Sequence, residues 1–99
     1  MLLVAGTVRV PSENVDRFRP HMAAMMAASQ GEAGCLDYNY AEDVAKPGLI
    51  HVFERWESQA ALDAHFQTPH MATWRAAWPS FGVSDRRLIA YEVASERPL

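Results

Sequence analysis

The chain has 99 residues, of which 49% are hydrophobic, and a formal net charge of −3. This length suits one domain, and we expect a single domain over residues 1–99. The apolar content excludes a disordered chain, and the acidic balance with scattered Lys and Arg argues against a nucleic-acid partner. No apolar run approaches the ~20 residues of a membrane span, so no membrane partner is expected. The single cysteine, Cys35, excludes an internal disulfide, and we expect a soluble, cytoplasmic protein.

The expected elements begin with a strand, a helix and a β-hairpin. Residues 2–10 are rich in Val and Leu, a pattern typical of a strand. Ser12 is the expected N-cap of a helix, because apolar residues then recur at helical spacing until Gly31 ends the pattern. Residues 34–40 and 49–56 predict the two strands of the hairpin, since the Ala-Lys-Pro-Gly sequence between them is typical of a turn.

The second half of the chain predicts a broken helical region and a last strand. Ser58 is the expected cap of a short helix, and Thr68 followed by Pro69 predicts the start of a new helical segment. Pro79 and Gly82 are expected to end this segment, and residues 87–93 predict the fourth strand. The new segment has an apolar stripe at positions i, i+3 and i+7, formed by Met71, Trp74 and Trp78.

This order of elements predicts an α+β fold of the ferredoxin-like βαββαβ type, a four-stranded antiparallel sheet with the helices on one face. The strands, however, are apolar on both faces. In the third strand one face has Ile50, Val52 and Trp56, and the other has Leu49, His51 and Phe53. The helices can cover one face only, and a second copy of the sheet is the most economical cover for the other. We therefore expect a homodimer with its two sheets packed face to face.

Three short motifs occur in order along the chain. They are Gly34-Cys35-Leu36-Asp37-Tyr38, Phe53-Glu54-Arg55-Trp56 and His65-Phe66-Gln67-Thr68-Pro69-His70. With the element order, they resemble the antibiotic biosynthesis monooxygenase family of dimeric α/β-barrel proteins. The resemblance implies a small oxygenase that acts on quinol- or anthrone-like substrates without a cofactor.

The resemblance also implies where the site lies. Family members keep their pocket between the helices and the helix-facing side of the sheet, which would place Trp56 on its wall and let His65 and His70 reach in. Heme-degrading relatives use Asn, Trp and His at positions that here correspond to Thr7, His65 and Arg75. This difference argues against a heme-degrading role.

His65 and His70 are the candidate catalytic residues. His65 shares a helical face with Leu62, so we expect it to point inward, where an imidazole suits a general base near neutrality. The alternative is a buried neutral histidine held by a backbone or hydroxyl partner. His70 follows Pro69 in the first turn of a helix, where the helix dipole favours the neutral imidazole. Its alternative is a solvated residue at a helix start.

The expected substrate-binding residues surround these histidines. Trp56 and Trp74 offer flat walls for a planar ring, and Tyr38 or Asn39 offers a hydrogen bond to a phenolic oxygen. Tyr38 and Asn39 lie on opposite faces of one strand, so only one of them can face the pocket. The set also includes Thr7 and Met71.

No metal or organic cofactor is expected. His65 and His70 are five positions apart across a helix break, and the chain has no Cys-x-x-Cys or His-Glu-x-x-His motif. It also has no Gly-rich phosphate loop. Cys35 has no marked activating neighbour, so a buried strand cysteine is expected rather than a nucleophile.

These residues predict a cofactor-independent monooxygenase for a small aromatic quinol, phenol or anthrone. His65 would remove a proton, and the resulting anion would react directly with O2 while Tyr38 or Asn39 stabilises the oxyanion. Two alternatives stay open because one fold hosts many activities. One is a non-oxidative isomerase, decarboxylase or cyclase that uses the same base. The other is a module that binds a small aromatic ligand without catalysis.

Overall fold

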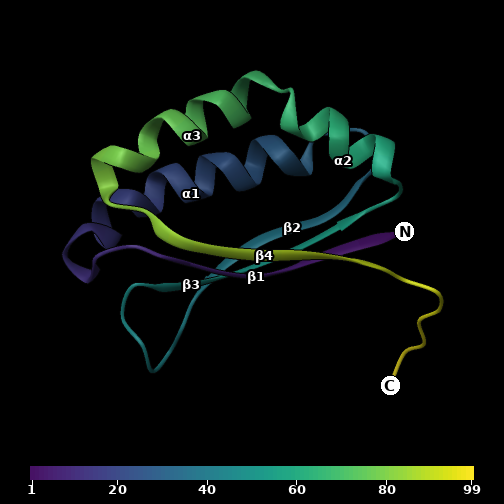
Figure 1. Ribbon diagram of the computed structural model, residues 1–99, viewed down its shortest axis with the longest axis horizontal. Coiled ribbons are helices and arrows are strands. Elements are labelled where there is room, and N and C mark those ends of the chain that lie inside the picture. Colours follow the sequence, from purple (N-terminus) through teal and green to yellow (C-terminus); the bar gives the residue numbers. More distant parts are fainter.

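A computed structural model describes all residues, 1–99. The elements follow in the order β1 (Leu2–Arg9), η1 (Ser12–Asn14), α1 (Val15–Gln30), β2 (Cys35–Glu42), β3 (Leu49–Trp56), α2 (Gln59–Phe66), α3 (Pro69–Phe81) and β4 (Ser84–Glu92). The strands form one antiparallel sheet in the order β2-β3-β1-β4, and the helices lie together on one face of it (Figure 1). The α+β, ferredoxin-like prediction is confirmed. No helix combines the length and apolarity needed to cross a membrane.

The break between α2 and α3 follows from two side-chain caps. The Ser58 hydroxyl accepts a hydrogen bond from the backbone N–H of Ala61, and the Thr68 hydroxyl accepts one from Met71. Pro69 occupies the first turn of α3, where its missing N–H costs nothing. Figure 1 shows the two helices as consecutive segments of one arch over the sheet. The predicted restart of the helix is therefore confirmed.

The start of α1 differs from the sequence-based expectation, and the end of α3 agrees with it. Ser12 opens the 3-10 turn η1, and the position before α1 is Asn14, whose side chain makes no capping bond. The Asn14 amide instead donates to the carbonyl of Phe81 at 3.0 Å. Pro79 lies inside the last turn of α3, and the helix ends at Gly82 with φ of 69°. That left-handed conformation suits glycine, so the helix ends at Gly82 as expected, with Pro79 in its last turn.

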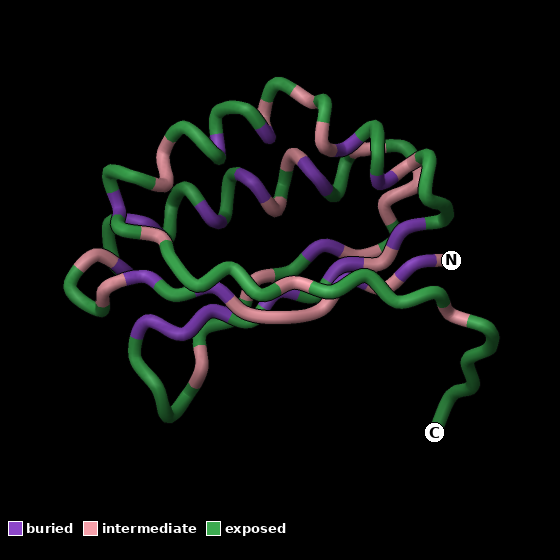
Figure 2. The backbone as a smooth tube through the Cα atoms, in the orientation of Figure 1, coloured by how far each residue is buried: buried purple, intermediate pink, exposed green.

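The two faces of the sheet differ in cover. On the helix-facing side, Val4, Ile50 and Trp56 are buried. Figure 2 shows buried positions along the strands and the helices, whereas the C-terminal strand and tail are mostly exposed. The opposite face exposes Ile89 by 56% and Tyr91 by 50% of their surface. The strands are thus apolar on both faces, as predicted, while the helices of one chain cover only one.

Candidate active site

A cavity of about 290 Å³ lies between the helices and the sheet. All four strands and all three α-helices contribute to its wall, which is mostly apolar. Its polar or aromatic lining includes Tyr38, Tyr40, Glu54, His65, Trp74 and Arg86. Small-molecule sites commonly enclose ~300–1,000 Å³, so this volume suits a ligand of a few rings at most.

One side of the cavity is aromatic. The rings of Trp74 and Tyr40 stack with centroids 5.3 Å apart and an angle of 11° between their planes. Trp74 and Met71, two of the expected substrate-binding residues, both line the cavity. Trp78 lines it as well, and its buried indole Nε1 has no hydrogen-bond partner. An oxygen atom of a bound molecule would satisfy this donor.

A pair of tyrosine hydroxyls faces the cavity from β2. The hydroxyl oxygens of Tyr38 and Tyr40 lie 2.6 Å apart. Burial raises the pKa of both phenols, so both stay protonated at neutral pH. Because one hydroxyl donates to the other, the accepting hydroxyl keeps its own proton for a further partner. Such a donor can stabilise a developing oxyanion.

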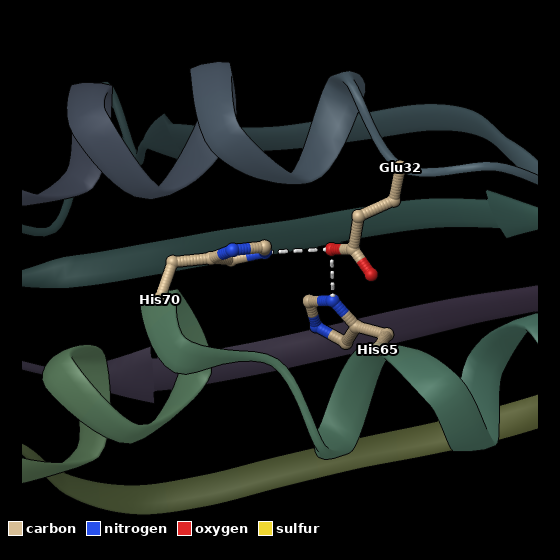
Figure 3. Close-up of side chains that lie close together, drawn as sticks. All are labelled: Glu32, His65 and His70. Atoms are coloured by element: carbon tan, nitrogen blue, oxygen red, sulfur yellow. Dashed lines mark hydrogen bonds and ion pairs between the residues drawn. The ribbon is translucent and has the colours of Figure 1, made fainter.

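The side chains of Glu32, His65 and His70 converge, as Figure 3 shows, and of the three only His65 lines the cavity. One carboxylate oxygen of Glu32, Oε2, lies 2.6 Å from His65 Nδ1 and 2.8 Å from His70 Nε2. Glu32 comes from the turn after α1, His65 from α2 and His70 from the first turn of α3. The three ligand atoms lie within 4.8 Å of one another, close enough to hold a metal ion.

The Glu32 bond determines what His65 can do. An ionised carboxylate only accepts hydrogen bonds, so His65 Nδ1 carries the proton and Nε2 is left as an acceptor. Burial lowers the pKa of His65, and the hydrogen bond to Glu32 partly opposes this shift. His65 lines the cavity and its side chain is only 1% exposed. The result is an oriented, neutral imidazole that can accept a proton from a bound molecule.

Trp56 lies behind this group rather than on the cavity wall. It is fully buried, and its ring centroid is 4.7 Å from that of His65. Its indole Nε1 donates to Glu54 Oε1 at 2.9 Å. Glu54 lines the cavity, and burial raises its pKa, while the nearby charge of Arg86 lowers it. Glu54 is therefore a second titratable group beside the ligand space.

The structure corrects two expected binding residues. Neither Thr7 nor Asn39 lines the cavity. Successive strand residues point to opposite faces, and their neighbours Val8 and Tyr38 are the ones that face the helices. Thr7 instead lies on the open face of the sheet. His70 also lies outside the cavity wall and reaches the site only through Glu32.

Sequence reasoning missed both glutamates. Glu54 had a usable signal, because it is a charged residue on the same strand face as Val52 and Trp56. Glu32 had no such signal, because a charged residue in a turn between two glycines is expected to be exposed to solvent. Its role depends on packing between α1, α2 and α3.

Comparison with known proteins identifies the family. The family model for antibiotic biosynthesis monooxygenase matches residues 1–77. The chain belongs to the antibiotic biosynthesis monooxygenase family. A Deinococcus radiodurans structure provisionally described as an antibiotic biosynthesis monooxygenase is similar to it, with a TM-score of 0.92 and 26% identity, covering 100% of this chain and 98% of that one.

Two further proteins are similar in sequence to this antibiotic biosynthesis monooxygenase family protein. An uncharacterised protein of Synechocystis is 29% identical over 98 residues, which are 99% of this chain and 67% of that protein. A Mycobacterium tuberculosis protein with a provisional monooxygenase name is 38% identical over 58 residues, 59% of this chain and 56% of that protein. The Mycobacterium tuberculosis name gives a reaction class and no substrate, and the Synechocystis name gives neither.

Proposed function

We propose that this protein is a cofactor-independent monooxygenase that oxidises a small aromatic quinol, phenol or anthrone with O2. The observation that carries the proposal is the placement of His65. Its ring lines an apolar cavity, while Glu32 holds Nδ1 at 2.6 Å and so leaves Nε2 for the substrate. Family membership and the provisional monooxygenase names of relatives support the same reaction class.

The proposed chemistry begins with proton removal. His65 Nε2 accepts a proton from the substrate, and the electron-rich anion that results reacts directly with O2. For an anthrone-type carbon, the anion and O2 form a hydroperoxide, and loss of water from it leaves a carbonyl. One oxygen atom thus enters the product and the other leaves as water. The stacked faces of Trp74 and Tyr40 orient the ring, and the Tyr38–Tyr40 pair donates a hydrogen bond to the oxyanion.

The active species in this proposal is a homodimer. Exposed apolar side chains on the open sheet face support it, among them Phe53, Ile89 and Tyr91. A second sheet packed against this face would remove these side chains from water. A cytoplasmic location belongs to the same proposal and is supported by the single, unpaired Cys35.

Oxygen uptake tests the proposal. Chelator-treated protein is mixed with a panel of quinols and anthrones, and wild type is compared with His65→Ala and with the control His21→Ala, a change at an exposed position of α1. We expect enzyme-dependent uptake in which His65→Ala lowers kcat by about 10²- to 10⁴-fold and His21→Ala has little effect.

Three other outcomes would redirect the assignment. Uptake that His65→Ala leaves unchanged would remove His65 as the base. Turnover of the substrate without oxygen uptake would favour a non-oxidative isomerase, decarboxylase or cyclase with the same base. Ligand binding without any turnover would favour a binding module.

A further inference from the structure

We propose that Glu32, His65 and His70 form a binding site for a divalent first-row metal ion such as Zn²⁺, and that the bound metal blocks the catalytic base. The site itself is argued from its own geometry. Only the inhibitory effect rests on the proposed function of His65.

The donor set is one that Zn²⁺ accepts. Two imidazoles and one carboxylate are a common three-residue ligand set, and they leave a fourth position for water. In the structure both imidazole nitrogens are directed at the same carboxylate oxygen (Figure 3), and all three ligand atoms lie within 4.8 Å of one another. The protein therefore already converges the three groups on one point.

A small movement would admit the ion. Bonds of ~2.0–2.2 Å in a tetrahedral arrangement place ligand atoms about 3.4 Å apart. Glu32 Oε2 now lies 2.6 Å from His65 Nδ1 and 2.8 Å from His70 Nε2, so the carboxylate must withdraw by less than about 1 Å. The two imidazole nitrogens, which lie within 4.8 Å of each other, must approach by up to about 1.4 Å. Glu32 lies in a turn and can shift by side-chain rotation. His65 is 1% exposed and stays in place, whereas the His70 ring is 26% exposed and has room to turn toward it.

Burial and charge set the expected affinity. The side chains of His65, Glu32 and His70 are 1%, 12% and 26% exposed, so His70 gives the site its opening to solvent. Glu32 contributes one negative charge. Arg75 acts electrostatically on His65 and opposes a bound cation. We therefore expect micromolar rather than nanomolar affinity.

Metal binding would change which nitrogen of His65 bears the proton. Without metal, Nδ1 carries the proton and donates to Glu32, and Nε2 is the acceptor next to the cavity. A metal ion takes the lone pair of Nδ1, so the single proton of the neutral ring moves to Nε2. No proton is gained or lost by the ring, but Nε2 becomes a donor. It can then no longer accept a proton from the substrate.

Calorimetric titration with Zn²⁺ tests the site without any need for activity. Chelator-treated wild type should bind one ion per chain, and Co²⁺ should give the visible absorption of a low-coordinate site. Glu32→Gln and His70→Ala should each weaken binding by roughly tenfold or more. The matched control is His51→Ala, because His51 pairs with Asp43 at 2.8 Å on the surface and could bind metal adventitiously.

Thermal melting shows whether the variants fold. If they do not, the titration of the wild-type protein still tests the proposed metal site. Absence of stoichiometric Zn²⁺ binding at millimolar concentration would overturn it. If His51→Ala weakens Zn²⁺ binding as much as the other two variants do, the ion binds at the surface and the proposed site is wrong.

Oxygen uptake in the presence of Zn²⁺ tests the inhibition. Turnover should fall with the same midpoint as the calorimetric titration, recover on chelation, and require more Zn²⁺ in His70→Ala. Bound Zn²⁺ with unchanged or increased turnover would overturn the inhibitory effect. If no substrate is turned over, the proposed function fails, while calorimetry still decides the metal site.

Discussion

His65 Nδ1 and the carboxylate of Glu32 lie 2.6 Å apart although 33 positions separate the two residues in the chain. The bond orients the His65 ring and selects its tautomer. The same carboxylate oxygen accepts a hydrogen bond from His70. One residue of the turn after α1 is therefore hydrogen-bonded to both α2 and α3 and fixes the position of the candidate base.

The variant Glu32→Gln should show whether Glu32 positions the His65 ring for catalysis or contributes to substrate binding. The amide can present either its oxygen or its NH2 group to His65, so the tautomer of the imidazole is no longer enforced. We expect kcat to fall roughly tenfold or more, with KM nearly unchanged, in steady-state oxygen uptake. The exposed Glu13→Gln serves as the control. A rise in KM at constant kcat would contradict the positioning role.

Filling the cavity should reduce ligand binding without a loss of stability. Leu88 is half-buried and lines the cavity, so the larger side chain of Leu88→Trp would occupy ligand space. We expect the Kd of an aromatic ligand to rise at least about tenfold, while Tm stays equal or increases. Val44→Trp, at a fully exposed hairpin position, should leave the Kd unchanged in the same calorimetric titration. If Leu88→Trp binds the aromatic ligand as tightly as the wild type does, the ligand does not bind in this cavity.

Sedimentation should detect the homodimer. At micromolar concentration we expect a species of twice the 11.1 kDa chain mass for wild type. The double variant Phe53→Lys, Ile89→Lys places two charges on the open sheet face and should sediment as a monomer. Ala24→Lys adds a charge at an exposed position of α1, on the other side of the sheet, and should remain dimeric. A wild-type monomer would show that the face is covered in another way or not at all.

Glu54→Gln should stabilise the protein at neutral pH. Burial raises the folded-state pKa of Glu54, so its contribution to stability is lost as pH rises through that value. The amide oxygen can still accept from Trp56 Nε1 and carries no charge. We expect a Tm higher by a few degrees at pH 7, with the difference vanishing near about pH 4. The exposed Glu57→Gln should show no such pattern, and a lower Tm for Glu54→Gln at pH 7 would contradict the raised pKa.

The thiol of Cys35 should react slowly with alkylating reagents. Burial, with smaller contributions from nearby carboxylates, raises the pKa of this thiol to about 11. The reactive thiolate is therefore scarce, and alkylation by iodoacetamide at pH 8 should be about a hundredfold slower than for a free cysteine. The rate should rise with pH toward about 11. Rapid alkylation of the folded protein at pH 8 would contradict this.

Local sequence signals determined the order of elements. Apolar spacing and the Thr68-Pro69 signal correctly predicted the sheet and the helix break. The alternation of strand residues also predicted that only one of Tyr38 and Asn39 faces the cavity. These features depend on backbone periodicity and capping, which neighbouring residues control.

Only the tertiary structure decided which charged residues join His65 in the site and that Thr7 lies outside it. Thr7 was assigned by resemblance, but the pleat of β1 turns it toward the open face. Glu32 lies in a turn with no local pattern, and only the packing of α1 against α3 and α2 brings its carboxylate to His65 and His70. A hydrogen bond between residues far apart in the chain leaves no periodic trace in the sequence, which is why this group appears only once the helices are packed.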